Sequence, residues 1–387
     1  MKILHVCLAS FFPDNYSYQE NMLPKFHKQQ GHEVEVIASL DTFDENGKAS
    51  YYEKASQYRN EYDIPVTRLA YREPIKVFTR LRRYVGTAEA LEKAAPDLMF
   101  IHGCQFLDMD VFVRYCKKHP NVRVYVDNHA DFSNSARNWL SRNVLHGIVW
   151  KHCAHIIEPY VTKFYGVLPV RVDFLKNVYG LPEQKCELLV MGADDEKVAA
   201  AAQPEVRQRI RQKYGLAEDD IVVMTGGKID AFKTQTLLLM EAVQNIDDPR
   251  LKLVVFGSVT PDLKEQVNAR ADGEKVQYIG WVEAKNSYDY FAAADLVVFP
   301  GRHSVFWEQV AAQGIPMLVK SWDGTHHVDL GGNVHFLYED KVEEIQGELE
   351  ALLKDPQRLA NMKKVAMEKG MKTFSYNDIS RRAIAND

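Results

Sequence analysis

The chain has 387 residues, of which 46% are hydrophobic and 26% are charged, and its net charge is −5. These values predict a soluble globular protein of about two domains. The acidic balance gives no electrostatic support for a nucleic-acid partner. No apolar run approaches the roughly 20 residues that span a bilayer. The five cysteines are odd in number and scattered, which favours a reducing, cytoplasmic compartment over a disulfide framework.

The N-terminal stretch "MKILHVCLASFF" is interpreted as a buried strand rather than a signal peptide. His5 interrupts the apolar run, Pro13 and Asp14 follow directly, and there is no small-residue cleavage pattern. Helical spacing then alternates with short apolar runs. The strands expected in this half include "EVEVIAS", "DLMFIHG", "VRVYVDN" and "HIIEP". Such alternation is typical of a parallel sheet with crossover helices.

The pattern restarts after about residue 195, with strands expected at "DIVVMTGG", "LKLVVFG", "VQYIGW", "DLVVFP" and "PMLVKSW". The polar and Ala-rich region 196–218 is expected to contain the linker. The C-terminal stretch is expected to be a helix that breaks at Gly370 and resumes. The sequence therefore predicts two doubly wound α/β domains, whose ligands bind at the carboxyl ends of the strands.

The stretch "TGGKIDAFKTQTLL" begins at the end of a predicted strand and opens a helix. Gly227 allows close approach of a ligand to the backbone, and Lys228 and Lys233 bracket the loop. Two point charges and the N–H groups of a helix start suit a pyrophosphate. On spacing alone, solvated surface lysines remain the alternative.

The order of motifs resembles the retaining nucleotide-sugar glycosyltransferases of the GT-B class, family four. The resemblance rests on "GKIDAFK", "YGLPEQKCELLVMGAD", "LVVFGS", "VQYIGWV", "YFAAADLVVFP" and "FSYNDIS", and it covers nearly the whole chain. It implies two facing Rossmann-like domains: an acceptor domain over 1–196 and a nucleotide-sugar donor domain over 197–371. Residues 372–387 would form a C-terminal helix that crosses back to the first domain.

The resemblance also implies site residues. Lys228 and Lys233 would hold the donor diphosphate, with Lys228 in place of the usual Arg. Trp281 and Val282 would lie beside the nucleobase, and His129 would lie near the donor sugar, although a helix-capping or core role for this histidine stays open. The residues expected to take part in catalysis are His129, Lys233 and Glu308.

The stretch "GRHSVFWEQVAAQGIP" departs from the family, whose members have two glutamates at this loop and helix. Either Glu308 or Gln309 takes the place of the second, and Glu308 is preferred because a carboxylate accepts from both ribose hydroxyls. The first glutamate is missing, which leaves His303 and Ser304 to meet the sugar. Ser304 and Val305 could offer N–H groups to a phosphate.

No metal site is predicted. The acids Asp108 and Asp110 are interpreted as solvated residues at a helix start, and His152 and His155 have no further ligand beside them. The loop 325–332, which contains His326 and His327, could border the donor site.

These features predict a retaining, metal-independent hexosyltransferase without a cofactor. The donor would be a UDP- or GDP-linked sugar and the acceptor a glycan or a lipid-linked glycan, in bacterial surface polysaccharide synthesis. A nucleotide-sugar epimerase of the same fold and a catalytically decayed sugar-nucleotide-binding protein remain alternatives. The basic segment 72–86 lies in the half of the chain that is net positive and predicts weak peripheral contact with the anionic inner face of the membrane.

Overall fold

The computed structural model describes residues 1–44, 48–73, 79 and 81–385. The chain divides into two compact units, which we call unit 1 (Met1–Met191 with Asn377–Asp387) and unit 2 (Gly192–Tyr376). These bounds differ by five residues from the predicted domains 1–196 with 372–387 and 197–371.

Unit 1 is built on an eight-stranded sheet in the order β10-β9-β8-β7-β1-β2-β6-β5, in which only the β5–β6 pair is antiparallel. The strands are β1 (Lys2–Cys7), β2 (Glu33–Ala38), β5 (Ser56–Arg59), β6 (Pro65–Arg68), β7 (Leu98–His102), β8 (Arg123–Asn128), β9 (Val161–Gly166) and β10 (Cys186–Leu188). A separate hairpin pairs β3 (Asp41–Phe43) with β4 (Ala49–Tyr51). The central strands are buried along almost their whole length, as parallel strands covered on both faces are.

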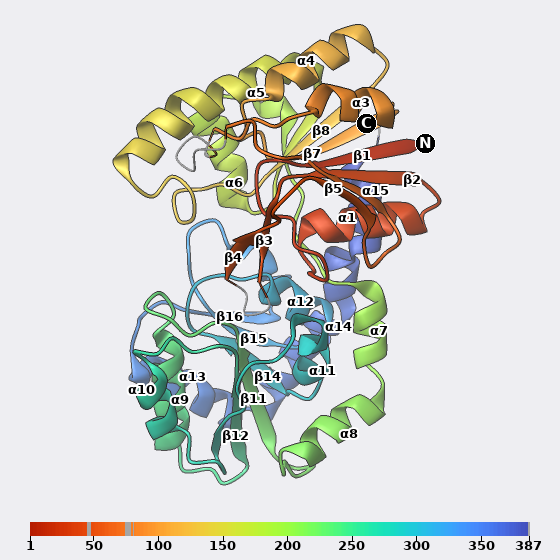
Figure 1. The fold of residues 1–387 in the computed structure, drawn as a ribbon. Coiled ribbons are helices and arrows are strands. Elements are labelled where there is room, and N and C mark those ends of the chain that lie inside the picture. The colour runs from red at the N-terminus through yellow and green to blue at the C-terminus, as the bar shows by residue number, and fades with distance from the viewer. Residues whose placement is uncertain (45–47, 74–78, 80, 386–387) are drawn as a thin grey trace. The chain divides into compact units, whose positions relative to one another are not determined.

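Helices lie on both faces of this sheet, with α1 and α15 on one side and α4 and α5 on the other (Figure 1). Their bounds are α1 (Gln19–Gln29), α3 (Thr87–Ala94), α4 (Met109–Lys118), a π-helical segment (Ser141–Trp150), α5 (Lys151–Ile157), α6 (Pro169–Phe174) and α15 (Tyr376–Ala383). The C-terminal segment belongs to unit 1 because its backbone bonds there: the Tyr125 hydroxyl donates to the Ala385 carbonyl at 2.8 Å.

Unit 2 has a six-stranded, fully parallel sheet in the order β13-β12-β11-β14-β15-β16. The strands are β11 (Ile221–Gly226), β12 (Leu251–Phe256), β13 (Val276–Tyr278), β14 (Leu296–Phe299), β15 (Met317–Lys320) and β16 (Val334–Leu337). The helices are α7 (Asp195–Ala201), α8 (Pro204–Lys213), α9 (Gln235–Asn245), α10 (Lys264–Arg270), α11 (Ser287–Ala292), α12 (Phe306–Ala312), α13 (Val342–Lys354) and α14 (Pro356–Phe374). This is the predicted Rossmann-like α/β architecture.

Three local predictions were wrong. The region 196–218 is not a linker, because α7 and α8 occupy it and Arg207 and Arg211 both pair with Asp295, at 2.6 and 2.7 Å. The segment "HIIEP" ends helix α5 rather than forming a strand. Asp108 is buried rather than solvated, since its carboxylate accepts from the Tyr84 N–H at 2.9 Å and from a threonine hydroxyl.

The predicted break at Gly370 was also wrong, because α14 continues to Phe374. Gly370 lies where α14 crosses α12, and a Cβ atom built on it would stand 1.9 Å from the Ala311 carbonyl oxygen. The glycine is therefore needed for close helix packing, and its weak helix propensity is overridden by that packing.

Candidate functional site

The phosphate loop, which we define as residues 226–233, leaves the carboxyl end of β11 and leads into α9. Gly227 has φ of 126°, a value that favours glycine, and its N–H donates to the Phe256 carbonyl at 3.0 Å. A Cβ on Gly257 would stand 1.9 Å from the Gly227 carbonyl oxygen. Two loops of neighbouring strands thus approach closely, and this holds the backbone that presents the lysines.

Both lysines of this loop line one small cavity in unit 2. The cavity is lined by Thr225, Gly226, Gly227, Lys228, Lys233, Thr236, Phe299, Pro300, Gly301, Arg302 and Ser304. Arg302 is a third cation that the sequence reasoning missed. Its position directly after β14, at the same sheet edge as the phosphate loop, is the signal that could have identified it.

The charges of the phosphate loop are only partly compensated. Lys228 is 62% exposed and lies 3.7 Å from the Asp230 carboxylate. Burial lowers the pKa of Lys233, and the negative charge of Asp230 offsets part of that decrease. Lys233 at the cavity is therefore a partly desolvated cation. The negative charge of an anionic ligand would offset the energetic cost of that desolvation.

Glu308, at the first turn of α12, is fully buried and held by two histidines. Its Oε1 atom accepts from His303 Nε2 at 2.8 Å and from His327 Nε2 at 2.7 Å. Burial alone would raise the pKa of Glu308, but the two imidazoles outweigh it and lower the pKa to about 2. Glu308 thus ties the loop after β14 to the loop 325–332. Its predicted contact with a ribose stays a prediction, and its enclosure favours a supporting role.

The remaining residues predicted in unit 2 are spread around the same sheet edge. Trp281 and Val282 follow β13 and are not among the residues that line the cavity, and Trp281 is exposed. Val305 precedes α12 at its N-cap position. Gln309 is buried, and its Oε1 has no hydrogen-bond partner among the described residues.

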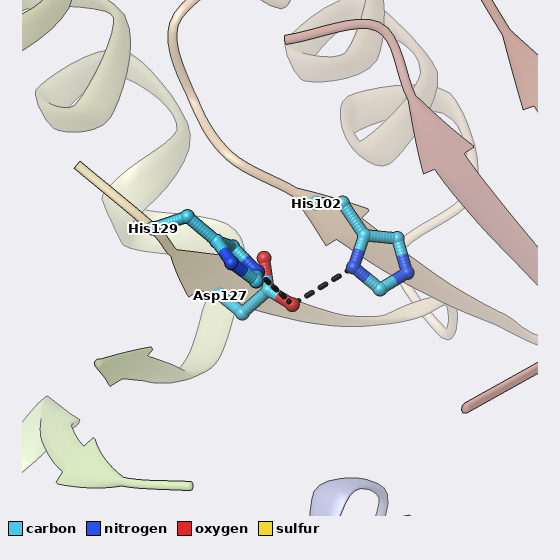
Figure 2. Close-up of side chains that lie close together, drawn as sticks. All are labelled: His102, Asp127 and His129. Atoms are coloured by element: carbon cyan, nitrogen blue, oxygen red, sulfur yellow. Dashed lines mark hydrogen bonds and ion pairs between the residues drawn. The ribbon is translucent and has the colours of Figure 1, made fainter. Parts of the chain in front are cut away.

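His129 lies in unit 1, directly after β8, beside a carboxylate that strand β8 itself supplies (Figure 2). Its Nε2 lies 3.3 Å from Asp127 Oδ2 and 3.8 Å from Glu20 Oε1, and its side chain is 28% exposed. Burial alone would lower the pKa of His129, but the charges of Glu20 and Asp127 raise it. Asp127 in turn accepts from His102 Nδ1 at 2.8 Å. His102, the last residue of β7, is thus part of the surroundings of His129.

Two groups of side chains could approach a cation, since the donor atoms within each lie within 4.8 Å of one another. They are His303, Glu308 and His327 in unit 2, and His102, Asp127 and His129 in unit 1. In both groups the nitrogen–oxygen separations of 2.7–3.3 Å match hydrogen bonds or ion pairs between the side chains. These contacts therefore need no ion to explain them.

Residues 206–369, which make up most of unit 2, match the family model described as Glycosyl transferases group 1. Most of unit 2 is therefore similar to a group 1 glycosyltransferase domain. Mannosylfructose-phosphate synthase of Agrobacterium fabrum is 24% identical to this chain over 254 residues, which are 62% of this chain and 53% of that protein. The chain therefore spans about half the length of this relative.

Solved structures place the group 1 domain in a complete GT-B fold. Anabaena HepE in complex with UDP superposes with a TM-score of 0.68 at 14% identity, covering 99% of this chain and 98% of that one. A sucrose-phosphate synthase from Thermosynechococcus elongatus gives 0.67 at 15% identity, covering 98% and 96%. The predicted resemblance to GT-B glycosyltransferases of the family-four type is confirmed.

In the part of the chain that the structure describes, no helix combines the length and the apolar character needed to traverse a bilayer.

The five cysteines are all free and buried.

Proposed function

We propose that this protein is a glycosyltransferase that moves a sugar, with retention, from a nucleoside-diphosphate sugar to a glycan or lipid-linked acceptor. The observation that carries the proposal is the grouping of Lys228, Lys233 and Arg302 at one cavity beside a glycine-bearing loop. A diphosphate is the ligand class that matches three cations and exposed backbone N–H groups.

In the proposed reaction these cations stabilise charge that develops on the diphosphate as the bond from the sugar to phosphate breaks. The acceptor hydroxyl forms the new bond on the face from which the diphosphate leaves, and its proton passes to a phosphate oxygen. Such fixed electrostatic stabilisation is often the largest contribution to catalysis. We propose that it acts here without a divalent metal ion and without a cofactor.

The comparisons support a nucleotide donor in particular. The structure of HepE was determined in complex with UDP, and mannosylfructose-phosphate synthase is named for a sugar-phosphate product. We propose UDP or GDP as the nucleotide of the donor of this protein, and bacterial surface polysaccharide synthesis as its setting.

The test begins with calorimetric titration of UDP, GDP and ADP, followed by transfer assays with the sugar nucleotides of the bases that bind. Proton NMR of the first product reports the anomer, and addition of EDTA reports any need for a metal ion. Transfer with retention in the presence of EDTA is the expected result. Isomerised donor in the absence of an acceptor would identify an epimerase instead. Binding without turnover across a broad acceptor panel would identify a decayed, sugar-nucleotide-binding protein.

Peripheral membrane contact belongs to the same proposal, but a different surface now supports it. Lys76, Val77 and Arg80 of the predicted basic segment 72–86 lie outside the described residues, and Arg83 lies 4.0 Å from Glu73. Residues 132–157, in contrast, include no acidic residue.

This acid-free segment also exposes large apolar side chains. Trp139 is 73% exposed, Leu140 58% and Ile148 64%, and the positively charged Arg142 lies among them in the sequence. A cationic surface with an exposed Trp fits the interface of an anionic bilayer.

Sedimentation with vesicles tests this contact. We expect binding to phosphatidylglycerol-containing vesicles at low salt and release as the salt concentration rises, because each basic residue contributes only about 1 kcal/mol. The double substitution Trp139→Ser, Leu140→Ser should abolish it. Equal sedimentation with neutral vesicles, or none at low salt, would contradict the contact and favour a water-soluble acceptor.

A further inference from the structure

Unit 1 contains a continuous row of hydrogen-bonded imidazoles that ends at Asp127. His27 Nε2 lies 2.8 Å from the Ser380 carbonyl oxygen, and His27 Nδ1 lies 3.0 Å from His5 Nε2. His5 Nδ1 lies 3.0 Å from His102 Nε2, and His102 Nδ1 lies 2.8 Å from Asp127 Oδ2. We call His5, His27, His102 and Asp127 the imidazole array.

The array is closed to solvent. His5, His27 and Asp127 have no exposed surface, and His102 is 2% exposed. The members come from β1, α1, β7 and β8, and Ser380 comes from α15. Because water does not reach these atoms, the side chains themselves must supply a proton for each hydrogen bond.

The hydrogen bonds of the array need more protons than three neutral imidazoles supply. The row has four hydrogen bonds, and each needs one proton. Ser380 contributes a carbonyl oxygen, which only accepts, and an ionised Asp127 also only accepts. Three neutral imidazoles carry one N–H each and so supply three protons. One proton more is required, or two lone pairs would face each other across one of these short contacts.

The position of the additional proton follows from the charges around it. Burial lowers the pKa of His5 well below its usual value, with its two neighbouring imidazoles acting in the same direction. Burial also lowers the pKa of His27, to about 4. His102 alone of the three contacts a carboxylate, whose negative charge favours an imidazolium beside it.

Other ionisable groups face the array without supplying the missing proton. These groups are Cys7, Glu20, His32 and His129, while Arg68 acts on Cys7 and Arg171 acts on His129. The Cys7 thiol stays protonated, because burial raises its pKa. Burial alone would raise the pKa of Asp127, but the charges of His102 and His129 outweigh it and hold that pKa well below its usual value.

We propose that the imidazole array binds one proton more than three neutral imidazoles carry, and that this proton resides on His102. The array thereby keeps Asp127 ionised, and through Asp127 it positions His129. The last part rests on the proposed function. Asp127 Oδ2, anchored by His102, attracts the Nε2–H of His129 and leaves the other ring nitrogen of His129 for a ligand.

The proton count is tested on the ligand-free protein labelled with ¹⁵N-histidine. At pH 8, long-range ¹H–¹⁵N spectra should show His5 and His27 as neutral rings protonated at Nε2, and His102 protonated at both nitrogens. Single His→Gln variants assign the signals. Three neutral rings at pH 8 would overturn the proposal, and this result does not depend on any enzymatic activity.

The substitution Asp127→Asn provides a second test that keeps the array intact. An amide can donate to His102 Nδ1, so all four hydrogen bonds form with three neutral imidazoles. His102 should then give the spectrum of a neutral ring protonated at Nε2. Persistence of a doubly protonated His102 in this variant would contradict the assignment of the proton to the His102–Asp127 pair.

The same proton links folding to pH. Above about pH 7.5 an unfolded chain has neutral histidines, so folding takes up one proton and stability falls as pH rises. The urea-derived unfolding constant of the wild-type protein should rise tenfold per pH unit relative to Asp127→Asn. Substitution of the exposed His152 by Gln should leave that dependence unchanged. Parallel pH dependences for wild type and Asp127→Asn would overturn the proposal.

A kinetic test addresses the positioning role separately. Asp127→Asn should lower kcat and shift its pH profile, while calorimetric binding of the nucleotide to unit 2 stays unchanged. If kcat were unaltered in Asp127→Asn while the spectra were as expected, the array would not position His129. The assignment of the additional proton to His102 would still hold. Absence of transferase activity in the wild type would contradict only the proposed function.

Discussion

The phosphate loop of unit 2 and the imidazole array of unit 1 both bring ionisable side chains together, but the side chains differ in how they are paired. In the array each ring nitrogen of the three histidines has a hydrogen-bond partner within the protein. In the phosphate loop Lys228 is 62% exposed and Lys233 is a partly desolvated cation. A charged side chain that is paired within the protein contributes to the stability of the fold, whereas one without such a partner is available to bind a ligand. Substitutions should separate these two roles.

The largest effect is expected from Lys233→Ala, which removes an uncompensated charge. Binding of the nucleoside diphosphate should weaken at least tenfold, because a hydrogen bond to a charged group contributes roughly 1.5–3 kcal/mol. Turnover should fall on the order of a hundredfold to a thousandfold, as when one preorganised donor is lost from an active site. Titration calorimetry and a transfer assay measure both quantities.

The thermal midpoint of Lys233→Ala should remain within a few degrees of the wild-type value. Lys364→Ala, which removes an exposed lysine of α14, is the matched control and should change neither binding nor turnover. Unchanged nucleotide affinity in Lys233→Ala would show that the diphosphate is held elsewhere.

Glu308→Gln examines a compensated charge that lies next to the phosphate loop. Relative to the ordinary value of 4.5, the pKa of about 2 corresponds to about 3 kcal/mol of folding free energy at neutral pH. This contribution is present above pH 4.5 and is lost as pH falls through about 2. The variant should therefore be less stable than the wild type at pH 7, and the difference should narrow with acidification.

Urea unfolding between pH 3 and pH 7 measures this effect. Glu348→Gln is the matched control, because Glu348 also pairs with a histidine, His335, but at a partly exposed position. It should cost about 1 kcal/mol or less. A Glu308→Gln protein as stable as the wild type, but with weakened nucleotide binding, would return Glu308 to the predicted ribose contact.

Gly226→Ala tests whether the phosphate loop depends on its packing. A Cβ on Gly226 would lie 2.3–3.0 Å from the nearest ring atoms of Phe256. Such overpacking typically costs about 1–3 kcal/mol. Thermal unfolding should show this loss, and the double variant with Phe256→Leu should recover most of it. If the double variant were no more stable than Gly226→Ala, the strain would lie in the backbone rather than in the contact with Phe256.

The smallest effect is expected from Lys228→Arg. Lys228 is exposed and takes the place of the Arg that the family resemblance predicts, so nucleotide affinity should change by less than about tenfold, or 1.4 kcal/mol. Arginine can contact a phosphate through two N–H groups, which favours an increase. A large decrease measured by calorimetry would indicate that the loop fits an ammonium group alone.

Much of the fold could be predicted from the sequence, because the alternation of apolar runs and amphipathic helices is strong. The placement of Lys228 and Lys233 in one loop at a strand end could be predicted as well, since both lie within one strand–loop–helix stretch. Arg302 was overlooked, because its place beside Lys233 at the cavity depends on the pairing of β11 with β14, and only a comparison of the two strand ends would have indicated it. The helix at 204–213 was missed because Ile210 is its one buried apolar residue, and its ion pairs to Asp295 are made by Arg207 and Arg211, which add nothing to an apolar periodicity.

The histidine contacts were hidden for a related reason. His5 was noted only as an interruption of an apolar strand, and its partners lie 22 and 97 residues away in the chain. His327 and Glu308 are separated by 19 residues and by a complete strand. Hydrogen bonds between distant segments leave no periodic pattern, so only the folded structure could bring these side chains together.

The return of the chain to unit 1 has a consequence for biosynthesis. His27 donates to the Ser380 carbonyl, and Gln30 donates to the Ser380 hydroxyl at 2.7 Å. Unit 2 is one uninterrupted segment, whereas unit 1 needs residues that the ribosome adds after all of unit 2. During translation all residues of the unit 2 sheet are made before α15, and until then His27 Nε2 lacks its Ser380 partner. A nascent chain that stops before Ser380 would therefore be a substrate for chaperones and proteases rather than a shorter enzyme.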